Sequence, residues 1–206
     1  MKIIVIGASG TIGRAVANAL EGRHEVVRAS AGKSPVKVDL GSKESLAAMF
    51  RTVGRVDGVI CAAGLAAFNP LTELTDKDFA LSCGNKLMGQ VNLVRTGLDY
   101  ISDRGVIILT AGILSRRPMK GSAAISMVNA GLEGFCRAAA LELPRGIRLN
   151  VVSPGWVTET LKLYKMDPAG GTPAEAVART YVKALEGGMN GEVLDAIEAE
   201  AAAGAR

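Results

Sequence analysis

The sequence predicts an α/β fold in three layers, in which helices cover both faces of a parallel sheet. Short apolar segments alternate with longer segments of helical pattern. The short segments are continuous runs of Val, Ile and Leu, which is typical of strands buried on both faces. The length of 206 residues, with 49% hydrophobic residues, fits one domain with a sizeable core.

Seven short segments have the composition of buried strands. They are Lys2–Ile6, Glu25–Ala29, Val36–Val38, Asp57–Cys61, Gly105–Thr110, Ile147–Val152 and Gly191–Leu194. The helical segments between them are Thr11–Glu21, Ser42–Val53, Asp76–Ile101, Ser122–Leu143 and Pro173–Glu186. Ser42 and the pair Thr172-Pro173 resemble helix starts, and Pro144 with Gly146 is expected to end the fourth helix.

This alternation predicts right-handed crossovers and a doubly wound parallel sheet of about seven strands, which is the Rossmann fold. We expect the domain to span residues 1–197. The Ala/Glu-rich tail 198–206 has no apolar face, so we expect a frayed helix or a disordered segment there.

Charge and composition exclude several classes of function. The net charge of +4 comes from scattered Lys and Arg residues without a basic, aromatic-containing run, so nucleic-acid binding is not expected. The cysteines lack metal-ligand spacing and the one histidine, His24, lies in a polar stretch, which argues against a metal site or a histidine triad. Neither a leader pattern nor a membrane-spanning apolar run is visible, so we expect a cytoplasmic protein with reduced thiols.

A glycine-rich turn follows the first predicted strand and opens the first predicted helix. Its sequence is Gly7-Ala8-Ser9-Gly10-Thr11-Ile12-Gly13. Gly7 permits a tight turn, Gly10 lets the backbone approach a pyrophosphate, and Gly13 allows close packing of helix on strand. The helix N-terminus adds free N–H groups and a partial positive charge. The turn therefore predicts a dinucleotide site, with Ser9, Thr11 and Ile12 among its contacts.

The end of the second predicted strand favours NADP(H) over NAD(H). Binding of a ribose 2′-hydroxyl uses an acidic residue there, and residues 27–33 contain none. Arg14, Arg28 and Lys33 are candidates to meet a 2′-phosphate instead, and Ser30 is a candidate hydrogen-bond donor to it. The alternative is that these cations are solvated surface residues.

With these residues assembled, the chain resembles the short-chain dehydrogenase/reductase family over nearly its whole length. Further segments that carry the resemblance are Val38-Asp39-Leu40, Cys61-Ala62-Ala63-Gly64 and Pro154-Gly155-Trp156-Val157-Thr158. The resemblance implies that Asp39 and Leu40 lie at the adenine and that Pro154, Gly155, Val157 and Thr158 lie at the nicotinamide, with Ala62, Ala63 and Gly64 in the same site. It also implies dimers or tetramers formed through the helices 81–101 and 121–143.

The catalytic positions of the family do not match. Its Tyr and Lys, four residues apart on the long helix, correspond to Ile125 and Asn129. Its Asn on the preceding long helix corresponds to Lys86, so Asn and Lys are exchanged, and its Ser falls near Thr110. Isoleucine has no ionisable group and cannot donate the proton that the tyrosine supplies. Lys86 is a candidate to hold the nicotinamide ribose and to act as an acid, or else it points to solvent; Thr110 either keeps a catalytic hydroxyl or is an ordinary strand residue.

Three functions follow as alternatives. The first is an NADP(H)-dependent oxidoreductase that acts on a small carbonyl or alcohol with a remodelled catalytic site. Lys86, Thr110, Ser115, Ser126 or a bound water would then donate the proton. The second is a non-catalytic NADP(H) sensor or scaffold, and the third is isomerisation or dehydration around a structural dinucleotide. The residues expected to line an apolar substrate pocket, or else to be core, are Met127, Trp156, Leu161 and Met166. The short segment 155–171 corresponds to the family's substrate lid, with Gly170-Gly171 as its hinge or a plain loop.

Overall fold

The structure is a computed structural model, and it describes residues 1–197. Seven parallel strands form one sheet in the order β3-β2-β1-β4-β5-β6-β7. The strands are β1 Lys2–Ile6, β2 Glu25–Ser30, β3 Val36–Lys37, β4 Val56–Cys61, β5 Ile101–Thr110, β6 Arg148–Pro154 and β7 Val193–Ala196. The helices are α1 Thr11–Leu20, α2 Lys43–Val53, α3 Asp76–Leu81, α4 Met88–Gly97, α5 Ala123–Ala139, α6 Thr158–Leu163 and α7 Ala174–Glu186.

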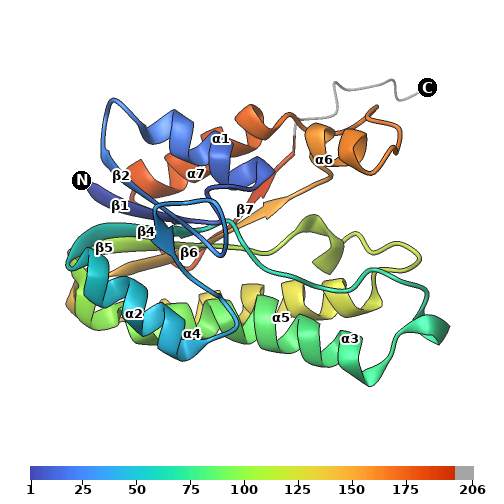
Figure 1. The fold of residues 1–206 in the computed structure, drawn as a ribbon, viewed down its shortest axis with the longest axis horizontal. Helices are drawn as coiled ribbons and strands as arrows, with labels where there is room; N and C mark the ends of the chain where they lie inside the picture. The colour runs from blue at the N-terminus through green and yellow to red at the C-terminus, as the bar shows by residue number, and fades with distance from the viewer. Residues whose placement is uncertain (198–206) are drawn as a thin grey trace.

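Helices cover both faces of the sheet, which confirms the predicted three-layer fold (Figure 1). α1 and α7 lie side by side on one face, and α2, α4 and α5 lie on the other. A mostly aliphatic core lies between the sheet and the helices on each of its faces. One core cluster joins strand residues to Leu46 and Phe50 of α2 and Leu132 of α5, and the other joins them to Val16 of α1 and Tyr181 of α7.

The segment Asp76–Ile101 is helical up to Tyr100, as predicted, but it is not α-helical throughout. It contains α3, a π-helical stretch Ser82–Leu87, α4 and a 3₁₀ turn Leu98–Tyr100. Ile101 belongs to the sheet, since it pairs with Val56 of β4. Wide π turns arise inside helices from one extra residue per turn, a change that apolar periodicity does not reveal.

Other element ends also differ from the sequence prediction. α5 ends at Ala139 rather than at Leu143. β7 runs over Val193–Ala196 instead of Gly191–Leu194, because Gly191 has a positive φ of 77° outside the strand. The short helix α6 was not expected, and it lies within the segment 155–171. The predicted start at Ser42 is confirmed, because its Oγ accepts a hydrogen bond of 3.1 Å from Ser45 N at the start of α2.

The predicted tail 198–206 lies outside the described residues. Within residues 1–197, none of the helices combines the length and the apolar character that crossing a bilayer requires.

Candidate functional site

The glycine-rich turn is built from backbone that leaves no room for side chains. Gly7 has a φ of 82°, and a Cβ atom there would lie 2.5 Å from the carbonyl oxygen of Ala62. A Cβ atom at Gly13 would lie 2.1 Å from the carbonyl oxygen of Gly7. Both distances are far below contact, so glycine is required at these two positions. The turn brings the end of β1, the start of α1 and the end of β4 together.

The start of α1 can receive an anion. Gly10 is the residue that precedes the helix and supplies no side-chain cap, and the first turn of α1 contains no acidic residue. The N–H groups of that turn have no intrahelical acceptor, and the helix dipole places partial positive charge beside them. Since added Cβ atoms would fill the cradle at Gly7 and Gly13, the turn fits the pyrophosphate of a dinucleotide.

The residues expected near a 2′-phosphate are partly engaged elsewhere. Arg28 donates to Glu21 Oε1 and Asn18 Oδ1 at 2.9 and 2.7 Å, so its side chain is turned along α1. The buried Ser30 accepts a hydrogen bond of 3.1 Å from Ser34 N. Arg14 is exposed. Lys33 is exposed as well, and neither Arg14 nor Lys33 forms an ion pair with another of residues 1–197.

The segment after β3, which the resemblance assigns to the adenine, packs against α4. Leu40 is buried, and its carbonyl oxygen would lie 2.7 Å from a Cβ atom at Gly89. The exposed Asp39 accepts a hydrogen bond of 2.9 Å from Gly41 N through Oδ1. A small residue on α4 therefore lets the strand end approach the helix closely.

A cavity of about 730 Å³ opens at the carboxyl edge of the sheet, where ligands of open α/β sheets bind. It brings together predicted cofactor and catalytic residues from six different segments: Ile12, Ala62, Ala63, Gly64, Lys86, Thr110, Asn129, Pro154, Gly155 and Val157. The predicted residues Gly7, Ser9, Gly10, Thr11, Gly13, Arg14, Arg28, Ser30, Asp39, Leu40 and Thr158 do not line it.

Lys86 is buried and faces this cavity rather than bulk solvent. It lies in the π-helical stretch, and its Nζ donates a hydrogen bond of 3.2 Å to Ala111 O. Its Cγ would lie 2.9 Å from a Cβ atom at Gly64, so the glycine makes room for the lysine stem. Burial lowers the pKa of the Lys86 ammonium to about 8, against a smaller opposite effect of Cys61. An ammonium with this pKa exchanges protons near neutral pH.

Asn129 also lines the cavity, in the position that the sequence comparison gave to the family's lysine. It is buried on α5, and its Oδ1 has no hydrogen-bond partner among the described residues. Its Nδ2 would lie 2.8 Å from a Cβ atom at Gly112. An unpaired buried acceptor costs free energy unless a ligand or water supplies a donor. Asn129 is therefore a candidate ligand contact, and Ile125, one helical turn earlier, lines the same cavity.

The Thr110 hydroxyl already has two partners. Its Oγ1 lies 2.6 Å from Cys61 O and 2.7 Å from the hydroxyl oxygen of Tyr181. A carbonyl oxygen can only accept, so Thr110 donates to Cys61 and Tyr181 donates to Thr110. Burial raises the pKa of Tyr181, which keeps its phenol protonated. The Thr110 proton is thus committed to the protein in this structure.

The backbone of Thr110 is held by Gln90, which is fully buried on α4. Gln90 Oε1 accepts from Thr110 N at 2.8 Å, and Gln90 Nε2 donates to Thr110 O at 2.9 Å. Thr110 lies beyond the last β4–β5 pair, Ile60 with Ile108, so the amide side chain takes the place of a strand there. These two hydrogen bonds hold in place the Thr110 backbone, which lines the cavity.

The segment after β6 forms one wall of the cavity. Trp156 O accepts a hydrogen bond of 2.8 Å from Thr172 N, and Thr158 N donates one of 3.0 Å to Thr172 O. These bonds close the segment 157–172 into a compact loop around α6. The segment that was expected to form the substrate lid is therefore held at its base by backbone hydrogen bonds.

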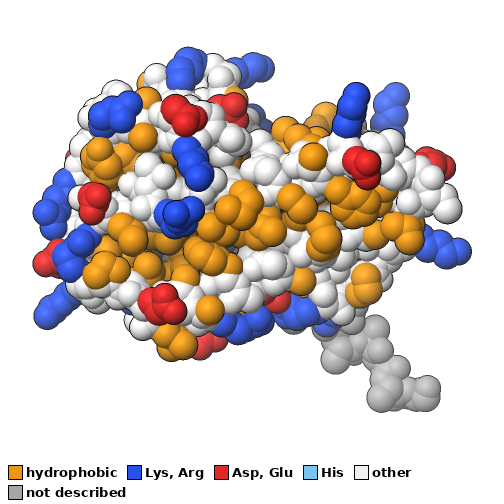
Figure 2. All heavy atoms as spheres, turned by 90° about the horizontal axis from the view of Figure 1, so that it is seen from below, with side chains coloured by type: hydrophobic (Ala, Val, Ile, Leu, Met, Phe, Trp, Pro, Cys, Tyr) orange, Lys and Arg blue, Asp and Glu red, His pale blue; other side chains and the backbone are white. Residues whose placement is uncertain are grey.

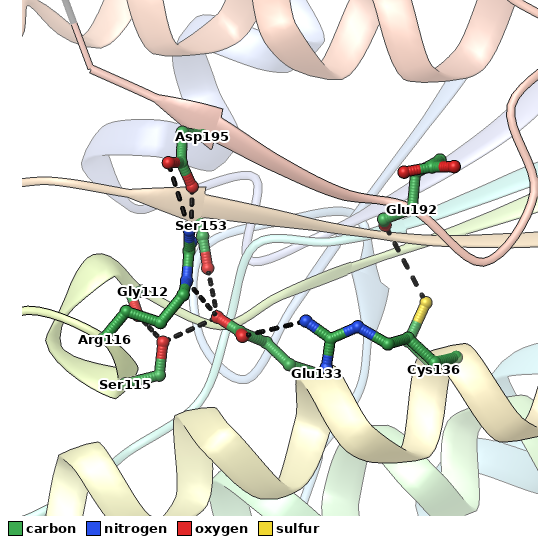
Figure 3. Close-up of polar contacts among 9 residues, drawn as sticks. Gly112, Ser115, Arg116, Glu133, Cys136, Ser153, Glu192 and Asp195 are labelled. Carbon is green, nitrogen blue, oxygen red and sulfur yellow. Dashed lines mark hydrogen bonds and ion pairs between the residues drawn. The ribbon is translucent and has the colours of Figure 1, made fainter.

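A buried carboxylate supports the opposite wall (Figure 3). Glu133 of α5 is 4% exposed, and its Oε1 accepts from Ser115 Oγ at 2.6 Å and from Ser153 Oγ at 3.0 Å. Arg116 lies between Glu133 and Asp195 of β7. The cluster ties the 3₁₀ turn Ile113–Ser115, whose first residues line the cavity, to α5 and to β7.

Two of the four residues that were predicted to line an apolar pocket line the cavity. Trp156 and Met166 line the cavity, but Met127 is 45% exposed outside it, and Leu161 is buried without lining it. Ser126 Oγ donates to Ser122 Oγ at 3.0 Å and does not line the cavity either.

Sequence reasoning missed eight wall residues. They are Ala66, Phe68, Ala111, Gly112, Ile113, Leu114, Thr160 and Tyr164. They follow β4, β5 and β6, and the rule that ligands bind beyond the carboxyl ends of parallel strands is the signal that could have found them.

The sequence profile of a family described as enoyl-(acyl carrier protein) reductase matches residues 7–186 of the chain. A 3-oxoacyl-[acyl-carrier-protein] reductase from Bos taurus is 29% identical over 175 residues, which cover 74% of each chain. The match to the family includes the glycine-rich turn and every residue that lines the cavity.

Solved structures are similar over almost the whole chain. The protein lin1944 from Listeria innocua is 41% identical with a TM-score of 0.90, covering 95% of this chain and 98% of its own. A small-chain dehydrogenase in complex with NADPH is 26% identical with a TM-score of 0.83, and 95% of each chain is covered.

Proposed function

Because the chain belongs to the short-chain dehydrogenase/reductase family of oxidoreductases, we propose that it transfers hydride between NADP(H) and a small carbonyl or alcohol through a remodelled catalytic site. One observation carries the proposal. A buried ammonium, Lys86, lines the same cavity as Asn129, whose Oδ1 is unpaired among the described residues, and as Ile12 of the glycine-rich turn.

The bound nicotinamide would supply the hydride, and the protein would supply position and a proton. Gly7, Gly10 and Gly13 would hold the pyrophosphate by backbone approach and helix dipole. The Lys86 ammonium would hold the ribose hydroxyls and release a proton toward a developing alkoxide, and its place in the cavity wall supports this role. Its pKa of about 8 suits this role, since a general acid works best when its pKa is near the working pH.

We propose NADP(H) rather than NAD(H) as the cofactor. The support is the absence of an acidic residue in 27–33 and the presence of the exposed Arg14 near the start of α1. A similar small-chain dehydrogenase was solved with NADPH. We expect calorimetry to give an NADPH dissociation constant at least about tenfold lower than that of NADH, a difference of roughly 1.4 kcal/mol. Equal constants would refute the preference.

The test of the function is oxidation of NADPH in the presence of aldehydes, ketones and quinones. We expect consumption of NADPH that depends on the carbonyl compound. Lys86→Ala should weaken NADPH binding and slow turnover, whereas Lys77→Ala, which removes an exposed lysine of α3, should change neither. An unchanged NADPH dissociation constant in Lys86→Ala would remove Lys86 from the ribose site.

A non-catalytic NADP(H) sensor is the second candidate, and Ile125 favours it because the family's proton donor is missing. Tight NADPH binding without turnover on any carbonyl compound tested would support the sensor and refute the enzyme.

We also propose self-association to a dimer or tetramer through the helices 81–101 and 121–143. Figure 2 shows a band of hydrophobic side chains across the face that carries α2, α4 and α5. Exposed apolar residues on these segments include Leu81, Met88 and Met127. Light scattering should give a multiple of 21.3 kDa, and Met88→Lys with Met127→Lys should lower it to the monomer mass.

The three cysteines are free, and Cys61 and Cys136 are buried. This supports a reducing compartment, and we propose the cytoplasm.

A further inference from the structure

The outer part of the cavity, beyond Lys86 and Asn129, is lined mostly by aliphatic and aromatic side chains. Its side chains come from the loop after β4, the 3₁₀ turn after β5, α5 and the segment after β6. They are Phe68, Leu114, Ile125, Trp156, Tyr164 and Met166. Lys86 is the only charged side chain that lines the cavity among the described residues, and it belongs to the inner end. We call these six residues the outer wall.

Phe68 and Trp156 meet across the outer wall. Their rings form an edge-to-face contact with centroids 5.9 Å apart and planes inclined by 78°. Such pairs are attractive and present a fixed aromatic surface to a third group. The two residues come from loops that follow different strands, so the contact joins two sides of the cavity.

Both sides of this contact are held in place by hydrogen bonds. On the Phe68 side, Leu65 N donates to Asn85 Oδ1 at 2.8 Å and Ala67 N donates to Ser82 Oγ at 2.9 Å. On the other side, Thr172 N donates to Trp156 O at 2.8 Å. The aromatic wall is therefore part of the folded structure and does not depend on a ligand.

Gly121 makes room for the Phe68 ring. A Cβ atom at Gly121 would lie 3.2 Å from the ring, and the glycine has a φ of 88° that other residues rarely adopt. Ile125, which corresponds to the catalytic tyrosine of the family, extends this apolar surface inward. A ligand in the outer wall thus meets apolar atoms on several sides.

We propose that the outer wall binds the apolar ring of an uncharged aromatic aldehyde or ketone, with Phe68 and Trp156 as the residues that determine specificity. This inference rests on the proposed function and names its substrate class. An anionic group in the outer wall would lose water without gaining a cationic partner, whereas a ring gains contact with Phe68 and Trp156.

Two measurements test the proposal. The first compares kcat/KM for benzaldehyde, para-carboxybenzaldehyde and glyceraldehyde with NADPH. We expect benzaldehyde to exceed each of the other two by at least about tenfold, because each lacks either the neutral ring or the ring itself. Equal or higher values for the carboxylate or for glyceraldehyde would overturn the proposal.

The second measurement does not need turnover. Trp156 is the only tryptophan of the chain, so its emission reports occupation of the outer wall. Benzyl alcohol should shift or quench this emission in a saturable way, and para-carboxybenzyl alcohol should do so at least about tenfold more weakly. The absence of a saturable change with benzyl alcohol would overturn the proposal.

Phe68→Ala should raise KM for benzaldehyde by about tenfold and leave kcat/KM for glyceraldehyde within about twofold, since only the ring uses the aromatic wall. The matched control is Leu71→Ala, which removes an exposed apolar side chain from the same loop outside the cavity. Loss of benzaldehyde selectivity in both variants, or in neither, would contradict the assignment of Phe68.

The outcomes separate the two proposals. Saturable binding of benzyl alcohol without turnover of any aldehyde would refute the oxidoreductase function and support the outer wall as a ring site. Turnover without preference for the neutral ring would support the function and refute the substrate class.

Discussion

The Nζ atom of Lys86 donates a hydrogen bond of 3.2 Å to the carbonyl oxygen of Ala111, so a lysine on a helix meets the backbone beyond the end of β5. The lysine is 8% exposed. A charged group in this place loses most of its water and receives one neutral acceptor in return. The bond therefore holds the ammonium at the cavity without compensating the cost of its burial.

The first prediction concerns stability. Burial lowers the Lys86 pKa to about 8 from 10.5, so between these pH values the unfolded chain binds more protons than the folded one. The loss of stability that comes from burying the Lys86 charge is then fully present below about pH 8 and disappears as the pH rises to about 10.5. Lys86→Met removes the charge but keeps the length, and it should stabilise the ligand-free protein at neutral pH by about 1–3 kcal/mol.

Urea unfolding of the two proteins at neutral pH and above pH 10.5 measures this effect, and the difference should shrink at the higher pH. Lys77→Met on the exposed face of α3 is the control and should change little. A destabilised Lys86→Met protein at neutral pH would mean that the hydrogen bond to Ala111 outweighs desolvation.

The second prediction concerns the pH dependence of turnover. Carbonyl reduction needs the protonated donor, so its rate should fall as pH rises through about 8, and alcohol oxidation should rise through the same pH. Burial raises the pKa of the neighbouring Cys61 thiol to about 12, so the thiol does not titrate in this range. Rates measured from about pH 6 to 10 in both directions give the profile. Persistence of the same inflection in Lys86→Met would identify another donor, such as a bound water.

The sequence allowed the sheet, its helices and the cofactor turn to be predicted because each has a local cause. Continuous apolar runs mark strands that are buried on both faces, and Gly7 and Gly13 stand where a side chain would strike backbone. The parallel direction of the strands follows from the alternation of strands and helices.

The remaining features depend on contacts between distant segments. The π turn at Ser82–Leu87 leaves no trace in apolar periodicity, yet Lys86 within it is buried and not solvated. Phe68 reads as an ordinary loop residue until the fold sets its ring beside Trp156. Met127 was expected to line the pocket or to belong to the core, but it lies on the exposed side of α5, at 45% exposure.

The third prediction tests the glycine turn with a matched pair of substitutions. A Cβ atom at Gly13 would lie 2.1 Å from Gly7 O, whereas one at Gly134 on α5 would have nothing within 4 Å. Gly13→Ala should therefore move the turn, abolish NADPH binding and destabilise the protein by more than about 2 kcal/mol. Gly134→Ala should stabilise it by up to about 1 kcal/mol, since alanine is the better helix former.

Thermal unfolding and NADPH calorimetry on both variants provide the measurements. Normal NADPH affinity in Gly13→Ala would show that the backbone at the turn can yield, and that the close approach is not required for binding.

The fourth prediction separates charge from hydrogen bonding at Glu133 (Figure 3). Its carboxylate accepts from the hydroxyls of Ser115 and Ser153, while its two arginine neighbours, Arg116 and Arg137, have side chains that are 41% and 57% exposed. Ion pairs with exposed arginines contribute little, about 0–1 kcal/mol each, because water screens them. The buried Ser153 hydroxyl would lose its acceptor at a cost of about 1–3 kcal/mol. The half-buried Ser115 hydroxyl would lose less, because it can still donate to Gly112 O, 3.0 Å away.

Hydrogen bonding should therefore dominate at this position. Glu133→Gln keeps an acceptor oxygen for the two serines and should destabilise the protein by about 1–2 kcal/mol, whereas Glu133→Leu removes the oxygen that both serines share and should cost about 2–4 kcal/mol. Urea unfolding at low and high salt distinguishes the two effects, since only an ionic contribution weakens with salt. If both variants lost the same stability, and the loss vanished in high salt, the charge of Glu133 and not its acceptor oxygens would be what holds the 3₁₀ turn against α5.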